Sequence, residues 1–321
     1  MATYKEIHGT NIEVLSSDPS NPVSGQIWYN TSTNLVKAFK INTGTWASGG
    51  ALNAARYSLT GVGTLTAGLV FGSAGSPPGA TNLTELYNGT AWTVGNVLNN
   101  TGFMRGGAGT QTSAIAFGGG PSPQPVGAET ETFNGTSWTT SPQALPSAKL
   151  AMTGAGTQTS ALSIGGTTGS PGLNTVETWN GSWTSAPTLT YGRAYTAGFG
   201  ASNTNALVAG GEYPGSSYNY VETFNGTWSN APTLNTGRAQ LAAAGTTSAG
   251  LVFGGTNSPY TSATETWDGS SWTTSSNVLA SARRKLAGAG SSTAAFAAGG
   301  YNTQSATEEW NAGSSTVTFA S

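Results

Sequence analysis

The feature that most constrains this chain is an internal repeat of about 45 residues. Six glycines open the copies at intervals of 46, 47, 44, 45 and 45 residues. A unit of this length is one supersecondary element that cannot bury its own apolar face, so it must stack on copies of itself. The opening glycines are Gly63, Gly109, Gly156, Gly200, Gly245 and Gly290.

Each copy contains short apolar, β-branched and aromatic runs bounded by Gly, Asn, Ser and Pro, with no helical stretch between them. This pattern predicts β-strands. An Asn-Gly or Asp-Gly pair separates the last two runs in five copies, which predicts a tight two-residue hairpin with positive φ angles. Four antiparallel strands repeated six times are typical of a β-propeller. The turn pairs begin at Asn88, Asn134, Asn180, Asn225 and Asp268.

The second run of each copy ends in a small pair, which is Gly72 and Ser73 in the first copy and a diglycine in the others. An aromatic residue and then a tryptophan follow. In these features residues 55–321 resemble the kelch repeat, although their strands are shorter and richer in Ala, Gly and Thr. The aromatic residues are Tyr87, Phe133, Trp179, Phe224, Trp267 and Trp310, and the tryptophans are Trp92, Trp138, Trp183, Trp228 and Trp272.

The resemblance implies an all-β, kelch-like β-propeller of six four-stranded blades. Residues 1–24 are expected to be an extended anchoring arm, and residues 25–54 to be an N-terminal hairpin with closing strands. The N-terminal hairpin would dock on the last blade or form a seventh blade with the C-terminal strand. The predicted repeats are 55–100, 101–147, 148–191, 192–236, 237–281 and 282–321.

Composition excludes several classes of function. Only 7% of residues are charged and the net charge is −2, which argues against nucleic-acid binding. Cysteine is absent, so disulfides, thiolate metal sites and a cysteine nucleophile are excluded. No long apolar run and no signal peptide are present, so we expect no membrane insertion. We also expect no cofactor and no metal.

The few charges recur at fixed positions, a cation in the first strand and a glutamate in the third. We interpret them as a structural ion-pair ladder, because catalytic groups occur once and these occur in every copy. The alternative is a charged lining of the central channel that holds an ion or a carboxylate. In the second copy Gly102 stands where the other copies have a cation, and Arg105 follows three residues later. The ladder members are Arg56, Lys149, Arg193, Arg238, Arg283, Glu85, Glu131, Glu177, Glu222, Glu265 and Glu308.

No arrangement of residues predicts catalysis. His8 is the single histidine and precedes the repeats, so a Ser-His-Asp site is excluded. The segment WDGSSW at 267–272 is weakly similar to the Asp box of sialidases, but only one turn carries an aspartate. The carboxylate pairs Glu308/Glu309 and Glu129/Glu131 remain. The recurring tryptophans are interpreted as core wedges rather than sugar platforms.

The N-terminal segment resembles the opening of virion proteins of tailed marine phages, especially those that infect cyanobacteria. The repeats GAGTQTSAIAFGGG and GAGTQTSALSIGG are similar to repeats in those proteins. This resemblance implies a non-enzymatic virion structural or display protein in the tail, a fibre or the capsid exterior. The matching N-terminal residues are Asp18, Pro19, Gly25, Gln26, Ile27, Trp28, Tyr29, Asn30, Thr31 and Thr33.

In this interpretation the N-terminal arm binds other virion proteins, and the loops after each diglycine contact the environment. The alternatives are a lectin-like propeller that binds a host surface glycan and, ranked below it, an enzyme of sialidase or lyase type. The oligomeric state is left open. Tyrosines in the loops are the candidate ligand contacts, with capping of the sheet edges as an equal alternative; they are Tyr213, Tyr218, Tyr220, Tyr260 and Tyr301.

Overall fold

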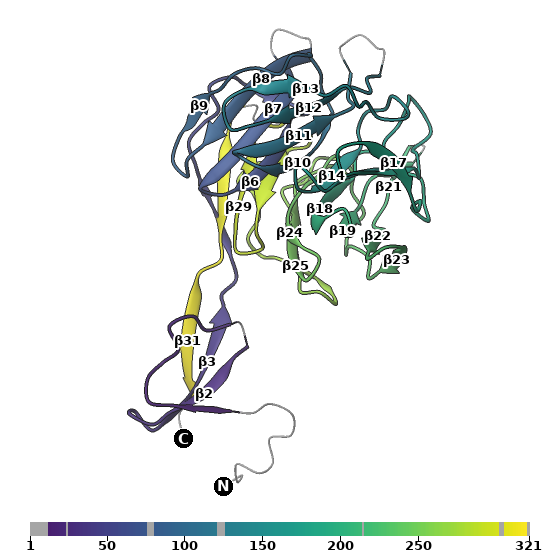
Figure 1. The fold of residues 1–321 in the computed structure, drawn as a ribbon. Helices are drawn as coiled ribbons and strands as arrows, with labels where there is room; N and C mark the ends of the chain where they lie inside the picture. The colour runs from purple at the N-terminus through teal and green to yellow at the C-terminus, as the bar shows by residue number, and fades with distance from the viewer. Residues whose placement is uncertain are drawn as a thin grey trace. The chain divides into compact units, whose positions relative to one another are not determined.

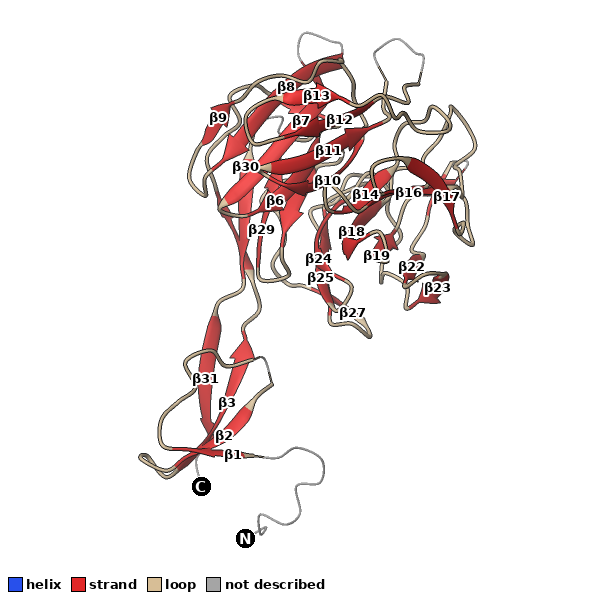
Figure 2. Ribbon diagram, viewed as in Figure 1, coloured by secondary structure: helices blue, strands red, loops and turns tan. Residues whose placement is uncertain are grey.

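A computed structural model describes residues 12–23, 25–75, 80–120, 126–213, 215–301 and 305–319. His8 and half of the anchoring arm predicted at 1–24 lie outside these residues. The described chain consists of β-strands and connecting loops, which confirms the all-β prediction (Figures 1 and 2). It divides into two compact units, one of residues 45–311 and one of residues 1–44 with 312–321.

The unit of residues 45–311 contains six antiparallel sheets, here named sheets 1 to 6, one for each repeat. Sheet 1 has five strands and each of the others has four. Sheets 1 to 3 are formed by β5 (Arg56–Tyr57), β6 (Thr60–Thr64), β7 (Ala67–Gly75), β8 (Ala80–Tyr87) and β9 (Trp92–Val94); by β10 (Gly106–Thr110), β11 (Ser113–Phe117), β12 (Thr130–Phe133) and β13 (Trp138–Thr140); and by β14 (Thr153–Gly156), β15 (Ala161–Ile164), β16 (Val176–Trp179) and β17 (Trp183–Ala186).

Sheets 4 and 5 follow the same order, and a two-stranded ribbon extends from the loop of repeat 4. Their strands are β18 (Ala197–Ser202), β19 (Asn205–Ala209), β22 (Val221–Phe224) and β23 (Trp228–Ala231), then β24 (Ala242–Thr246), β25 (Ala249–Phe253), β26 (Thr264–Trp267) and β27 (Trp272–Thr274), and in the ribbon β20 (Glu212–Tyr213) and β21 (Ser216–Ser217).

Sheet 6 is completed by a strand from the other end of the chain. Its first three strands are β28 (Ala287–Gly290), β29 (Ala294–Ala298) and β30 (Thr307–Asn311), and its fourth is β4 (Thr45–Ser48). β4 pairs with β30 so that Trp46 lies opposite Trp310. The N-terminal segment therefore supplies the tryptophan that the sixth repeat lacks.

The hairpins between the third and fourth strands are antiparallel as predicted, but their loops are longer than two residues. In sheet 1 four residues separate Tyr87 from Trp92. Asn88 accepts hydrogen bonds from the backbone N–H groups of Thr90 and Ala91, while Gly89 has a φ of 89°. The asparagine thus caps the turn with its side chain, and only the glycine needs a positive φ.

Neighbouring sheets pack face to face through six clusters of buried apolar side chains, one for each consecutive pair of sheets. The cluster that joins sheet 6 to sheet 1 contains Phe296, Tyr87 and Trp92. The first strands also contact one another in order, and β28 of sheet 6 contacts β6 of sheet 1. Sheet 6 is therefore a neighbour of both sheet 5 and sheet 1.

The residue two positions before each of the strands β6, β10, β14, β18, β24 and β28 adopts a left-handed conformation with φ between 54° and 57°. Its backbone N–H donates to the carbonyl oxygen of the equivalent residue in the preceding sheet, at 2.8–3.0 Å. The sixth such bond is donated by Ser58 to Lys285 and so returns from sheet 1 to sheet 6. The six residues are Ser58, Met104, Ala151, Tyr195, Gln240 and Lys285.

The second unit is a sheet made from both ends of the chain, in the order β1 (Glu13–Leu15), β2 (Ile27–Asn30), β3 (Leu35–Ile41) and β31 (Ser314–Phe319). β3 pairs with β31, as one of the two predicted arrangements requires, but β4 is not part of this sheet. Residues 25–54 therefore do not form one element, because β4 belongs to sheet 6. We refer to this second unit as the terminal sheet.

Asp18 connects the residues of the N-terminal motif within the terminal sheet. Its carboxylate accepts hydrogen bonds from Trp28 Nε1 at 3.0 Å and Asn30 Nδ2 at 2.7 Å, and forms an ion pair with Lys37 Nζ at 2.8 Å. Hydrogen bonds from Lys37, Asn30 and Trp28 lower the pKa of Asp18 to about 2. Trp28 is the one buried hydrophobic side chain among the described residues of this unit.

Candidate functional site

The structure brings every predicted ladder glutamate close to a cation. The cation precedes the first strand of its sheet and the glutamate lies on the third strand, and nitrogen-to-oxygen distances run from 2.6 to 3.9 Å. The pairs are Arg56 with Glu85, Arg105 with Glu131, Lys149 with Glu177, Arg193 with Glu222, Arg238 with Glu265, and Arg283 with Glu308.

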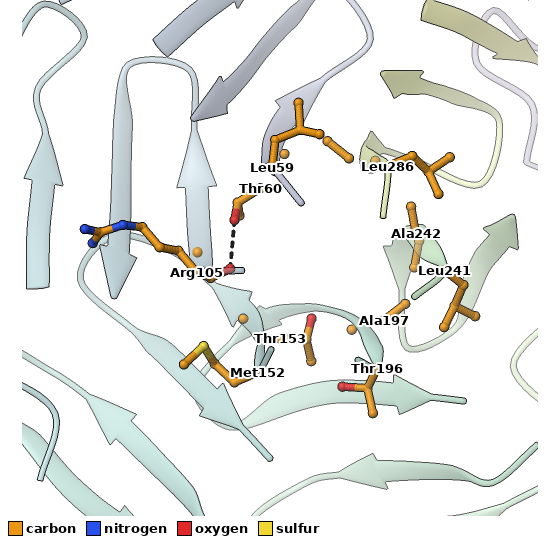
Figure 3. A pocket seen from close by; sticks show the side chains of 17 residues that line it. Leu59, Thr60, Arg105, Met152, Thr153, Thr196, Ala197, Leu241, Ala242 and Leu286 are labelled. Carbon is orange, nitrogen blue, oxygen red and sulfur yellow. Dashed lines mark hydrogen bonds between the residues drawn. The ribbon is translucent and has the colours of Figure 1, made fainter. Parts of the chain in front are cut away.

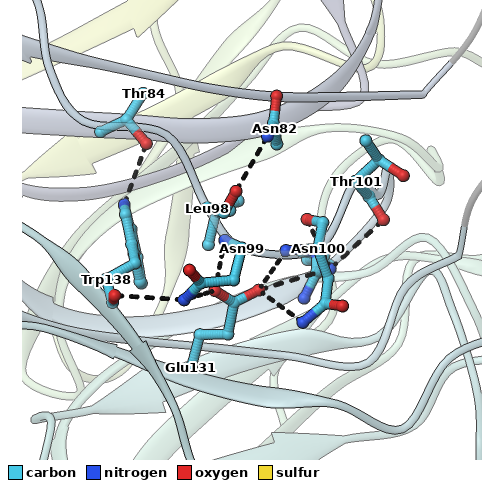
Figure 4. A network of polar contacts seen from close by, with 9 residues as sticks. Asn82, Thr84, Leu98, Asn99, Asn100, Thr101, Glu131 and Trp138 are labelled. Atoms are coloured by element: carbon cyan, nitrogen blue, oxygen red, sulfur yellow. Dashed lines mark hydrogen bonds and ion pairs between the residues drawn. The ribbon is translucent and has the colours of Figure 1, made fainter.

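Arg105 takes the place of the cation that is missing at Gly102. A Cβ atom built on Gly102 would lie 2.6 Å from Arg105 Nε, so the arginine side chain fills the space that a side chain at 102 would need. Its pair with Glu131 is the longest of the six, at 3.9 Å. Glu131 instead accepts hydrogen bonds from Asn99 and Asn100 through both backbone and side-chain nitrogens (Figure 4).

The glutamates also hold the linkers that connect consecutive sheets. In five repeats one carboxylate oxygen accepts a backbone N–H from the linker at 2.7–2.8 Å. The exception is Glu177, which receives no backbone N–H from its linker among the described residues. Pro146 stands at the equivalent linker position and has no N–H to give. Lys149 compensates in part with the shortest ion pair, at 2.6 Å.

Burial favours the structural interpretation of the ladder over a charged channel lining. Every ladder side chain is buried, and Arg193, Arg238 and Arg283 are fully inaccessible to solvent. Burial lowers the pKa of these arginines, to about 10 for Arg193, and the paired glutamate opposes that effect. Pairs in this environment spend much of their attraction on desolvation, so they fix the segment before each first strand to its own sheet more than they add stability.

The space between the first strands is lined by glycine, alanine and threonine together with larger apolar side chains such as Leu59 and Met152. A pocket of about 130 Å³ is bordered by residues of all six sheets (Figure 3). Arg105 contributes to its edge, but its guanidinium points away from the pocket. Thr60 donates to the carbonyl oxygen of Arg105 at 2.8 Å. Among the described residues no group of three or more His, Cys, Asp or Glu could hold a metal.

Glycine is required where the first strands approach each other. A Cβ atom on Gly154 of β14 would lie 2.1 Å from the carbonyl oxygen of Gly107 on β10. The diglycines serve a second contact, with the linker to the next sheet rather than with the central space. Gly211 donates its N–H to the carbonyl oxygen of Arg238 at 2.9 Å, and a Cβ on Gly210 would lie 2.5 Å from the same oxygen.

The tryptophans of the fourth strands are wedges between sheets. Trp138 Nε1 donates to Thr84 Oγ1 of the preceding sheet at 3.0 Å (Figure 4). Trp92, Trp183 and Trp46 make the same bond to Thr307, Thr130 and Thr264. Trp228 and Trp272 find no acceptor, because the preceding sheets carry Val176 and Val221 at that position. All but Trp46 and Trp228 are buried below 9% exposure, so these indoles offer no sugar platform.

Four of the five carboxylates considered for catalysis have structural partners, namely Glu131, Glu308, Glu309 and Asp268. Glu308 belongs to the ladder, and Glu309 accepts a short hydrogen bond from the hydroxyl of Tyr87. Asp268 accepts bonds from the backbone N–H and side-chain hydroxyl groups of Ser270 and Ser271, and these lower its pKa well below the usual range. The aspartate of WDGSSW therefore caps a hairpin turn.

The loop tyrosines form two clusters. In repeat 4, Tyr220 stacks on Tyr218 with ring centroids 4.9 Å apart and on Tyr191 at 4.5 Å. Tyr191 is 42% exposed and was not among the predicted contacts. The backbone of Tyr213 lies in β20, and its side chain is outside the described part of the structure.

Tyr260 and Tyr301 meet at the loops of repeats 5 and 6, where their rings are 6.1 Å apart and nearly perpendicular. Arg284 lies over both rings, and Tyr57 contacts Tyr301 at 5.2 Å. Sequence reasoning missed Arg284 and Lys285, although 283–285 is the single run of three consecutive cations in the chain. We call Tyr57, Tyr260, Tyr301, Arg284 and Lys285 the basic tyrosine cluster.

No protein-family model matches this chain, and a comparison with curated proteins finds no significant relative. Among the described residues no helix has the length and apolarity to cross a membrane. The candidate sites are therefore argued from the structure, and they are the two tyrosine clusters, which combine residues of the loops after the diglycines with residues that precede the first strands.

Proposed function

We propose that residues 45–311 are a closed, kelch-like propeller of six blades. Three features support this proposal, and each of them links sheet 6 to sheet 1. They are the cluster containing Phe296, the backbone hydrogen bond from Ser58 to Lys285, and the bond from Trp92 Nε1 to Thr307 Oγ1. β4 acts as the closing strand, because it comes from the start of the chain and pairs with the last repeat.

We further propose that the protein is a non-enzymatic structural or display component of a phage virion. In this proposal the propeller is a rigid scaffold in which six cations and six glutamates form buried pairs, one within each blade. The chemistry left on the surface lies in the loops, where a display protein would meet its environment. The terminal sheet attaches the propeller to another virion protein.

The observation that carries this proposal is the apolar surface of the terminal sheet. Val14 is 68% exposed, Val23 66%, Phe319 50% and Ile41 39%, while Trp28 is its one buried hydrophobic side chain among the described residues. So small a unit has little core to stabilise it alone. These exposed apolar side chains, on a unit with so little core, are the ground on which we propose that a partner covers part of the terminal sheet.

Purified particles of the phage that encodes the chain would test the proposal. Mass spectrometry should find the protein in those particles at a fixed copy number. Particles complemented with the double variant Val14→Ser and Phe319→Ser should contain several-fold less of it. Val94→Ser is the matched control, because Val94 is 60% exposed on the propeller. Absence from the particles, or equal loss with the control, would reject the assignment.

A lectin-like propeller is the second candidate function, and the stack of Tyr191, Tyr220 and Tyr218 favours it. Tyrosine rings with free faces bind the apolar faces of sugars and lose little entropy on binding. A glycan array should then show saturable binding that Tyr218→Ala or Tyr260→Ala removes. If the folded protein binds no glycan on the array, the lectin-like function is rejected and the display function is the proposal that stands.

A further inference from the structure

Arg284 and Lys285 differ from every other basic residue of the propeller unit. The other six cations of residues 45–311 are ladder members, each paired with a glutamate. Neither Arg284 nor Lys285 has an ion pair in the part of the chain that the structure describes, and both side chains are half-buried. Two unpaired cations side by side are exceptional in a chain with so few charges.

Three tyrosines surround these cations. The guanidinium carbon of Arg284 lies 4.6 Å from the ring centroid of Tyr260 and 5.1 Å from that of Tyr301. Lys285 Nζ lies 5.7 Å from the ring centroid of Tyr57. Contacts of this kind hold a cation in place without neutralising it. Tyr301 remains 42% exposed, so one wall of the cluster is open to solvent.

The electrostatics leave the cluster short of negative charge. Burial lowers the pKa of Lys285, and the charge of Arg284 lowers it further, while Glu212 opposes both effects. Burial raises the pKa of Glu212, and both cations oppose this effect. An incoming anion would relieve the repulsion between the cations and accept hydrogen bonds from their charged groups.

We propose that the basic tyrosine cluster binds an anionic saccharide, with its carboxylate or sulfate on Arg284 and Lys285 and its sugar ring against Tyr301. This inference rests on the lectin-like function and names its ligand class and its site. Tyrosine faces that flank the cations favour a sugar over a free inorganic anion, which would use the cations alone. The site is distinct from the stack of Tyr191, Tyr220 and Tyr218.

Binding of three oligosaccharides to the full chain would test the inference by isothermal titration calorimetry. A heparin hexasaccharide carries sulfate and carboxylate, hexagalacturonate carries carboxylate alone, and maltohexaose is neutral. We expect saturable, salt-sensitive binding of one or both anionic probes and no binding of maltohexaose. Arg284→Ala and Lys285→Gln should each lower the affinity by about tenfold or more, because each removes a charged donor.

The repeats themselves supply substitutions that fit the fold. Ala194 and Ala239 occupy the position of Arg284 in repeats 4 and 5, and Gln240 occupies that of Lys285. Circular dichroism should therefore give melting curves close to that of the unmodified chain. Lys40→Gln is the matched control, because it removes one exposed cation from the terminal sheet.

The inference is overturned if neither anionic probe binds, or if Lys40→Gln weakens binding as much as Arg284→Ala. Binding of maltohexaose that is lost with Tyr218→Ala would also overturn it, but would leave the lectin-like function standing. Binding of hexagalacturonate would identify carboxylate as sufficient, and binding of heparin alone would identify sulfate as the required group.

Discussion

At the scale of the residue, the hydrogen bond of the fourth-strand tryptophan divides the six interfaces between sheets into two classes. Where the third strand carries a threonine, the tryptophan of the next sheet has an acceptor for its indole N–H. Where it carries Val176 or Val221, the indole of Trp228 or Trp272 stays unpartnered. The fold thus tolerates a buried, unsatisfied donor at two of six interfaces, although each costs free energy.

Thr84→Val should lower the free energy of unfolding by about 1–3 kcal/mol, because it leaves Trp138 Nε1 buried without an acceptor. Urea denaturation followed by tryptophan fluorescence measures the change. Thr139→Val makes the same chemical change at an exposed position of β13 and should alter stability by less than about 0.5 kcal/mol. Equal effects of the two variants would show that the indole bond contributes nothing.

At the scale of the element, β4 is the strand whose place is most informative. Trp46 packs against Phe253 with ring centroids 4.8 Å apart and donates to Thr264, so it fills the interface between sheets 5 and 6. Trp46→Ala should cost about 3–5 kcal/mol and release β4 from β30. Hydrogen exchange at Glu308 to Asn311 should then accelerate, whereas Thr45→Ala on the exposed face should leave it slow. Unchanged protection would contradict the role of β4.

The terminal sheet should lose stability in acid. Since the pKa of Asp18 is lowered from 3.8 to about 2, its contribution is complete above pH 3.8 and is lost as the pH falls toward 2. The indole N–H resonance of Trp28 should shift over this interval in an NMR titration. Asp18→Asn should abolish the transition, and a shift that persists in that variant would assign it to another group.

At the scale of the whole molecule, the interface between sheets 6 and 1 carries a polar contact that the other interfaces lack. Tyr87 donates to Glu309, whereas the equivalent position in the other sheets is phenylalanine or tryptophan. Burial and this hydrogen bond raise the pKa of Tyr87 to about 12. The hydrogen bond between sheets 1 and 6 therefore requires that Tyr87 be neutral.

The sign of the pH dependence follows from that shift. A raised pKa means that the stabilisation is complete below pH 10 and declines as the pH rises toward 12. Tyr87→Phe should remove this alkaline decline, whereas Tyr191→Phe, at an exposed tyrosine, should retain it. Thermal melts between pH 8 and 12 measure the difference, and parallel declines in both variants would exclude Tyr87 as the cause.

Local properties of the chain were enough to predict the strands, the hairpins and the cation and glutamate positions. They could be predicted because each depends on a few neighbouring residues and recurs in every copy: glycines at positive φ, an asparagine that caps a turn, an apolar run of strand length. The length of the loop between the third and fourth strands could not be predicted. An Asn-Gly pair fits both a two-residue turn closed by backbone hydrogen bonds and the longer loop seen here, in which the Asn88 side chain accepts the hydrogen bonds.

Tertiary structure alone decided the rest, because the remaining contacts join residues that no local pattern relates. Trp46 and Thr264 are 218 positions apart, so the sequence left open whether the N-terminal segment docks on the last repeat, as β4 does, or pairs with the C-terminal strand, as β3 does. Arg284 gains its tyrosines only where the loops of repeats 5 and 6 meet Tyr57 from repeat 1. The sequence by itself therefore determined what each repeat would be, and packing across the chain decided which strand completes the last sheet and where two unpaired cations come together.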